Sequence, residues 1–489
     1  MFYDRRSTLW GKVASCLLPV LCAMLLGSCE KRDEYGVLVG DSGLKPGINY
    51  MQPNKWEITY RYKVKEIIPT RISRDKKPAA IDSGTPVVGP GTFEVWLCGP
   101  MACDEVRDVK LTYVNPEPTA QEYDEDQGIT YLYYDFAPDN RLPHNFAVEA
   151  TWTCYTFERY THWKDIEEMI KPYDKESEIY KRYTQEEYPI VFHKGLNKDA
   201  KDHVNVSDPD DIIGTCLNIY NDIVVNYNYD FLKMGYSQYG EDGLLPTDRV
   251  WINKRGVCDE FANIFCAMAR VNGIPARPCA GISHYPSEGG SAIDYNENGS
   301  DNYIGLELGQ HAWAEFYLEG VGWIPVDPTW ADDTEKIHKV LSPMGAKRGI
   351  TYPDYYFGKL DPFRITLYKG WNYHLKPEPR TPDADPVQDL MIMGTARHSN
   401  VKDMVYGFDW SELLTPEELA ATQYMGLEVA SVSNWEMNNM DYKVTHLSEM
   451  PKEELDPIIA EIRAEGHNYV QVPQFPWVNS REQMTDNSW

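Results

Sequence analysis

Basic residues are scarce in this chain compared with acidic ones. The sequence has 47 lysines and arginines against 75 aspartates and glutamates, for a formal net charge of -28. Such an acidic surface repels phosphate backbones, so no nucleic-acid partner is expected. The chain also lacks a Cys-X-X-Cys motif with a distant second pair, so a structural zinc site is not expected. We expect no metal site and no cofactor.

The composition is that of a globular protein. Hydrophobic residues make up 42% and charged residues 25% of the 489 positions, values too apolar for a disordered chain. At the usual domain size, a chain of this length holds about two to four folded units. After the first 28 residues no run is long and apolar enough to span a bilayer.

Residues 1–28 have the pattern of an export signal, with basic residues before an almost wholly apolar run at 13–26. The run ends in Leu25-Leu26-Gly27-Ser28-Cys29, which resembles a bacterial lipobox and implies that Cys29 is lipidated. An ordinary signal peptide or a transmembrane anchor is the alternative. Residues 29–45 read as a tether, and its charged segment 30–34 resembles the surface-targeting signals of Bacteroides-type lipoproteins. The resemblance implies a cell-envelope protein, lipid-anchored to the outer membrane, with surface exposure suggested by the tether.

Seven cysteines remain after the signal segment and Cys29 are set aside. An odd number of thiols outside the cytoplasm indicates that at least one stays free. Cys98 and Cys103 are close enough in sequence to form a disulfide, although two separate buried thiols are equally compatible with the pattern.

The chain after the tether changes its periodicity. Residues 46–165 alternate apolar and polar positions, with strands expected at 56–64, 92–98, 109–114, 129–136 and 146–157, which predicts a β-sandwich. Residues 166–375 predict an α+β domain, with a helix capped near Ser207-Asp208-Pro209, a second helix at 258–271, and strands at 311–318, 323–327 and 363–368. A proline-rich linker at 376–386 leads to a mixed α/β region of unknown fold at 387–489, with helices expected at 415–423 and 452–465 and an extended segment at 426–432.

Cys258 lies at the expected start of the helix at 258–271. The positive end of a helix dipole favours a thiolate, which is the reactive form of cysteine. Taken alone, a cysteine at a helix start is more often a small buried residue than a nucleophile.

Two later segments supply suitable partners. Strand alternation places His311 and Trp313 on one side of the segment at 311–316, and a three-residue loop at 319–321 would set Asp327 opposite Trp313 and diagonal to His311. One hairpin can therefore provide a base and a carboxylate that orients it. A buried histidine that merely pairs with a strand-end aspartate is the competing interpretation.

Four ordered motifs together resemble the transglutaminase-like superfamily. They are Gly256-Val257-Cys258-Asp259-Glu260-Phe261-Ala262, Gly273-Ile274-Pro275-Ala276-Arg277, His311-Ala312-Trp313-Ala314-Glu315, and Gly322-Trp323 with Asp327-Pro328-Thr329. The resemblance implies a papain-like α+β catalytic core, with Cys258 as nucleophile, His311 as base and Asp327 as its orienting partner. Tyr229 resembles the family's oxyanion donor, with Tyr227 as the alternative.

The resemblance implies an enzyme that transfers acyl groups from peptide or protein amide bonds. We expect hydrolysis, as in a peptidase or amidase, because water is always present. A cross-linking transglutaminase is one alternative, and a non-catalytic cell-surface protein that binds peptide or glycan is the other. The oligomeric state is left open.

The segment before His311 has two further features. Residues 294–299 match the first half of an EF-hand loop, but Gly305 stands where a bidentate glutamate is required, so a polar turn is expected. The polar segment 284–303 is long enough to form a rim or lid over the cleft, or a plain surface loop.

Overall fold

A computed structural model describes residues 45–66, 93–135, 146–164, 166–205, 207–230, 245–285, 307–331, 356–371, 373–378, 394–398, 405–406, 430–433, 441–446 and 450–471. It has the mixed α and β architecture expected from the sequence, with three larger sheets and one short two-stranded sheet in these residues. Among them no helix is both long and apolar enough to cross a membrane.

The largest sheet is built on two long antiparallel strands, β1 (Gly47–Glu66) and β6 (Phe146–His162). The alternation in the sequence explains β1, since Trp56 and Ile58 are buried and Glu57 between them is exposed. The remaining strands of this seven-stranded sheet are β3 (Val106–Asn115), β12 (Lys359–Leu360), β16 (Ala430–Ser433), β17 (Asp441–His446) and β18 (Asn468–Tyr469).

A second sheet has the strand order β15 (Val405–Tyr406), β14 (Gly394–His398), β2 (Phe93–Cys98), β5 (Ile129–Asp135) and β4 (Ala120–Asp124). All the strands expected between 56 and 157 are therefore present, distributed over two sheets. Segments from beyond the proline-rich linker join both: β14 pairs with β2, and β16 and β17 pair with β1. The described strands after residue 386 thus extend sheets that begin near the N-terminus.

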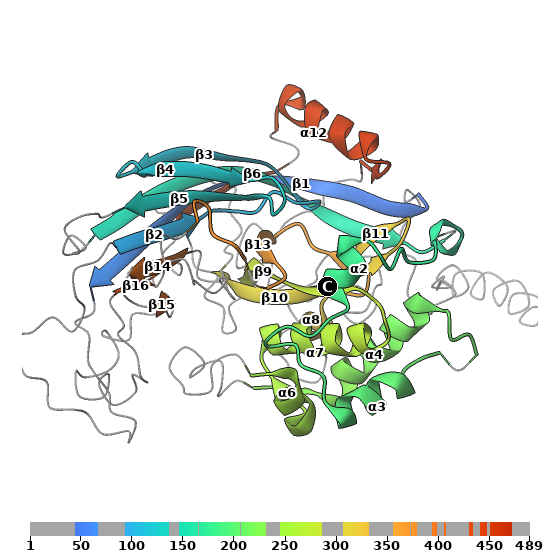
Figure 1. Ribbon diagram of the computed structural model, residues 1–489. Helices are drawn as coiled ribbons and strands as arrows, with labels where there is room; N and C mark the ends of the chain where they lie inside the picture. Colours follow the sequence, from blue (N-terminus) through green and yellow to red (C-terminus); the bar gives the residue numbers. More distant parts are fainter. Residues whose placement is uncertain are drawn as a thin grey trace, which may run out of the picture.

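The third sheet has the order β11 (Gly322–Val326), β10 (Glu307–Leu318), β9 (Ala276–Tyr285) and β13 (Ile365–Lys369), all antiparallel. Figure 1 shows helices on one side of this sheet and the β1–β6 sheet on the other. The described helices between residues 167 and 331 are η2 (Glu167–Met169), α2 (Glu178–Tyr183), α3 (Lys194–Asp202), α4 (Ile212–Asn226), α6 (Thr247–Asn253), α7 (Cys258–Val271) and α8 (Pro328–Ala331).

Helices α4 and α12 can be compared with the helix positions that were expected from the sequence. Helix α4 begins later than the Ser207-Asp208-Pro209 segment suggested, at Ile212, because the side chain of Asp211 accepts a hydrogen bond from the backbone nitrogen of Gly214 (2.7 Å) and caps the helix there. Helix α12 (Lys452–Ala464) confirms the helix expected at 452–465. The segment 415–423, and residues 426–429, lie outside the described residues.

Buried charges join the third sheet to the β1–β6 sheet. Lys369 on β13 contacts Glu105, which precedes β3, and Glu315 on β10, at 2.9 Å each. Arg159 on β6 lies 3.6 Å from the Glu315 carboxylate, and all four side chains are almost fully buried. Because unpaired buried charges are costly, this cluster fixes β10 and β13 relative to the larger sheet.

Candidate active site

Cys258 is the first residue of α7 and follows the short strand β8 (Arg255–Gly256). The buried Glu260 accepts hydrogen bonds from the backbone nitrogens of Val257 and Leu245, at 3.0 Å each. A Cβ at Gly256 would lie 2.8 Å from the Glu260 carboxylate, so only glycine fits this close approach. The helix start expected from the sequence is confirmed, with a partly exposed cysteine at its first position.

His311 and Asp327 come from the β10–β11 hairpin. The pairs Leu318–Gly322 and Ala314–Val326 give the register expected from the sequence, in which Asp327 stands just beyond the last pair and diagonal to His311. His311 Nε2 lies 2.8 Å from Asp327 Oδ2, and both side chains are buried.

The pair is enclosed by Trp330, which lies in helix α8 directly after the hairpin. Its backbone nitrogen donates to Asp327 Oδ1 (3.0 Å), and its indole meets the imidazole of His311 edge to face with ring centroids 5.0 Å apart. Asp327 therefore has one oxygen held by backbone and the other directed at His311.

Strand β10 also brings this pair to Cys258. The backbone of Ala312, the residue after His311, hydrogen-bonds to the Cys258 thiol, and α7 packs on β9 and β10. The structure thus places the three residues singled out in the sequence at one site, where a helix start meets a strand.

The resting thiol is neutral. Burial, together with the nearby charges of Asp259 and Asp327, raises the pKa of Cys258 to about 12 against the opposing effect of backbone hydrogen bonds. Burial and carboxylates therefore outweigh the helix terminus that led us to expect a thiolate. The thiol needs a base to react.

His311 has the properties of such a base. Burial lowers its pKa below the ordinary 6.5, although the charge of Asp327 partly offsets this effect, so the imidazole is neutral at neutral pH. Burial alone would raise the pKa of Asp327, but the charges of His311 and Arg364 outweigh it and hold this pKa below its ordinary value. A neutral imidazole beside an ionised carboxylate can accept a proton from a thiol.

The two tyrosines considered as oxyanion donors occupy different places. Tyr229 on β7 (Asn228–Tyr229) pairs with Gly256, two residues before Cys258, and is partly exposed. The hydroxyl of Tyr227 is 2.9 Å from Lys254 Nζ, and that ring is buried beneath the ammonium. Tyr229 is therefore the better placed of the two candidate oxyanion donors, because it pairs with the segment that leads directly to Cys258.

Arg364 was missed by sequence reasoning. Its Nη1 atom lies 2.6 Å from Asp327 Oδ2, the atom that also contacts His311, and its Nε donates to Asp361 (2.8 Å). The sequence placed Arg364 in the strand expected at 363–368, and nothing in the spacing of that segment indicated that tertiary folding would bring it to Asp327.

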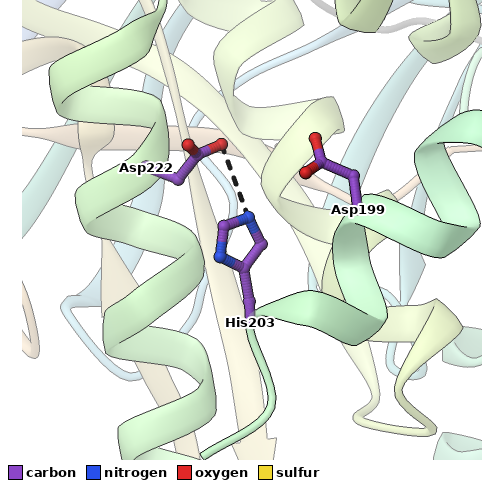
Figure 2. A group of neighbouring side chains, drawn as sticks. All are labelled: Asp199, His203 and Asp222. Carbon is purple, nitrogen blue, oxygen red and sulfur yellow. Dashed lines mark ion pairs between the residues drawn. The ribbon is translucent and has the colours of Figure 1, made fainter.

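A second polar cluster lies away from the triad, between α3 and α4 (Figure 2). Asp199, His203 and Asp222 have potential ligand atoms within 4.8 Å of one another, and His203 Nε2 is 3.5 Å from Asp222. Lys254 Nζ lies 3.3 Å from Asp199 and 3.9 Å from Asp222, so its charge already offsets part of the negative charge of the two carboxylates. The Asp199–His203 spacing of four within one helical turn was the signal available in the sequence, and we assign no metal here.

Three further expectations concern the cysteines, the half EF-hand and the polar segment 284–303. Among the described residues none of the seven cysteines that follow Cys29 forms a disulfide, so Cys98 and Cys103 are separate thiols. Cys29, the half EF-hand at 294–299 and nearly all of the segment 284–303 lie outside the described residues.

Comparison with known proteins adds an independent line. An uncharacterized protein of Haemophilus influenzae is 30% identical over 190 residues, 35% of this chain and 47% of that protein. A protein-glutamine gamma-glutamyltransferase of Pseudomonas aeruginosa is 32% identical over 103 residues, 21% of this chain and 14% of that protein. The chain thus spans about half of the first relative and about a seventh of the second.

Solved structures resemble the chain more loosely. A proposed cysteine protease of Cytophaga hutchinsonii matches 81% of this chain and 91% of its own, with 12% identity and a TM-score of 0.41. The model of the transglutaminase-like superfamily matches residues 201–328, which include Cys258, His311 and Asp327. Residues 201–328 of this chain are therefore assigned to the transglutaminase-like superfamily, and the rest of the chain is not matched by that model.

Proposed function

We propose that this protein is a cysteine-dependent enzyme that transfers acyl groups from peptide or protein amide bonds. The observation that carries the proposal is the buried His311–Asp327 pair, with Nε2 and Oδ2 2.8 Å apart, beside a cysteine at a helix start. The proposed roles are Cys258 as nucleophile, His311 as general base and acid, and Asp327 as the carboxylate that orients the imidazole.

In the first step the Cys258 thiol gives its proton to His311, and the sulfur attacks the amide carbonyl carbon. Asp327 holds Nε2, so Nδ1 is the nitrogen that receives the proton. When the tetrahedral intermediate collapses, the carbon–nitrogen bond breaks and His311 returns the proton to the leaving amine. This leaves a thioester between Cys258 and the acyl group.

The negative oxygen of the intermediate requires donors. The backbone N–H of Cys258 is free of helical partners at the first position of α7 and is the natural first donor. We propose the hydroxyl of Tyr229 as the second, since β7 holds this residue beside Gly256.

Water or an amine then resolves the thioester. We propose hydrolysis, because water is always present whereas selective capture of an amine needs a dedicated pocket. The likeness to a protein-glutamine gamma-glutamyltransferase favours the alternative, transfer to an amine such as a lysine side chain. The proposed triad would serve both outcomes.

The partitioning of the thioester between water and an amine distinguishes hydrolysis from transfer. The full chain is incubated with a glutamine-containing peptide library and a labelled primary amine, and mass spectrometry compares the released acid with the amine adduct. We expect acid in excess. Adduct in excess at millimolar amine would establish the transferase instead, and neither product with any peptide would contradict both.

The non-catalytic alternative is tested on the thiol itself. Cys258 should react with iodoacetamide faster than the fully buried Cys266, and His311→Gln should slow the reaction at Cys258 if the imidazole assists deprotonation. An equal rate in this variant would favour a peptide- or glycan-binding protein. Cys258→Ala, which should abolish turnover and leave the fold intact, is the matched control.

We also propose that lipidation of Cys29 anchors the protein to the outer membrane. The support is the sequence Leu25-Leu26-Gly27-Ser28-Cys29 and the charged segment after it. Cys29→Ser should move the protein out of the membrane fraction. If the variant stays in membranes after a high-salt wash, another anchor holds it.

A further inference from the structure

We propose that Arg364 is a positioning residue of this site, which fixes the carboxylate of Asp327 and limits the strength with which that carboxylate holds a proton on His311. This inference rests on the proposed function, because it concerns the same triad. It is carried by geometry that the sequence did not indicate.

One oxygen atom of Asp327 serves two cations or potential cations. Oδ2 lies 2.8 Å from His311 Nε2 and 2.6 Å from Arg364 Nη1, while Oδ1 accepts the backbone hydrogen bond of Trp330. The guanidinium therefore competes with the imidazole for the same negative charge. An aspartate that faced only His311 would stabilise the imidazolium more strongly.

Arg364 is itself held in place. Its Nε donates to Asp361 Oδ2 (2.8 Å), and the guanidinium lies between 5.2 and 5.6 Å from the ring centroids of Trp313, Trp330 and Tyr356. The side chain is only 1% exposed. Rings on several sides and a second carboxylate leave the guanidinium one orientation, toward Asp327.

The backbone holds the arginine's own segment against the hairpin. The nitrogen of Asp327 donates to the carbonyl of Tyr356 (2.9 Å), and Val326 forms a bridge with Phe357. The segment that leads to Arg364 is thus tied to the end of β11 by backbone, and Arg364 adds its ion pair with Asp327.

The charges that face His311 come from three places. Asp327 at the end of β11 raises the pKa of the imidazole, Arg364 before β13 lowers it, and Asp361 in the same segment raises it. Cys258, on α7, is the thiol that His311 would deprotonate. Because Arg364 contacts Asp327 directly, its loss should outweigh the loss of Asp361, and the imidazole should become more basic.

The experiment measures the titration of His311 by NMR of its ring in the full chain, with the resonance assigned by His311→Gln. Arg364→Met combined with Asp361→Asn removes the guanidinium without leaving Asp361 as an unpaired carboxylate. Arg364→Lys keeps a charge but loses the planar fork that reaches both carboxylates. Arg270→Lys is the matched control, because Arg270 is also buried but pairs with Glu187 near the opposite end of α7.

We expect the pKa of His311 to rise by about one unit in the double variant, less in Arg364→Lys, and not at all in Arg270→Lys. Alkylation of Cys258 at pH 7 should rise by about tenfold for each such unit, while amide turnover falls because the imidazolium returns its proton less readily. A purely structural role would lower both rates.

An unchanged His311 titration in the folded double variant would overturn the proposal. If the double variant does not fold, the titration of His311 is measured in Arg364→Lys instead. An unchanged pKa of His311 in that variant would also contradict the proposal. The proposed function is contradicted by a different result: an equal rate of Cys258 alkylation in the wild type and in His311→Gln.

Discussion

The carboxylate of Glu260 lies 3.0 Å from the backbone nitrogen of Val257, the residue that precedes Cys258. Its second oxygen accepts from the nitrogen of Leu245 at the same distance. One buried side chain therefore caps α7 and ties the chain before α6 to the turn that presents the cysteine. The position of the proposed nucleophile depends on a residue that performs no chemistry.

Glu260→Ala should lower the free energy of unfolding by about 1–3 kcal/mol, because two backbone N–H groups lose their acceptor. The rate of Cys258 alkylation should change as well, since the turn is no longer fixed. Urea denaturation and timed alkylation measure the two effects. Glu453→Ala, in the exposed first turn of α12, is the control and should change neither. Unaltered stability of Glu260→Ala would show that the cap is dispensable.

Tyr229→Phe should reduce kcat by about 10²–10³-fold with little change in KM, if its hydroxyl stabilises the oxyanion. Tyr227→Phe is the matched control, because that hydroxyl is engaged by Lys254. Steady-state kinetics on a substrate found in the partitioning experiment provide the measurement. A larger loss in Tyr227→Phe would reverse the assignment.

Lys369→Met should destabilise the fold by about 3–5 kcal/mol, because Glu105 and Glu315 each lose one of their buried cations. The double variant with Glu105→Gln should recover part of this loss in thermal or urea unfolding. Lys198→Met, which breaks an exposed pair with Asp202, should have no measurable effect. Equal stability of the wild type and Lys369→Met would mean that water or rearrangement compensates the cluster.

The stability of the protein should decrease as the pH falls from 7 to 5. Burial lowers the pKa of folded His311 below the ordinary 6.5, so the unfolded chain binds more protons in this interval. The stability contributed by the neutral imidazole is present above the unfolded pKa of 6.5 and is lost as the pH falls from there through the lower pKa of the folded protein. Urea denaturation at several pH values should give a shallower decrease for His311→Gln. A slope as steep as that of the wild type would exclude this histidine as the source.

Local patterns were sufficient for much of the site. The apolar period of 258–271 placed a helix start at Cys258, and the alternation of 311–316 with a three-residue loop fixed the register that brings Asp327 to His311. These features depend on contacts within a helix or a hairpin, and such contacts are encoded by residues close in sequence. The domain organisation was harder to predict from the sequence, because strands after residue 386 pair with β1 and β2, which lie about 300 residues or more earlier in the chain.

By itself, the sequence determined the residue types, the order of the motifs and the short-range geometry of the base and its carboxylate. Only the tertiary structure decided the protonation of the site, because burial raises the pKa of Cys258 and lowers that of His311 in proportion to how completely the fold removes water. It also decided the place of Arg364, which approaches Asp327 across 37 residues through backbone pairing and a cage of aromatic rings. Electrostatic effects of this kind depend on distance in space, and no local pattern records that distance.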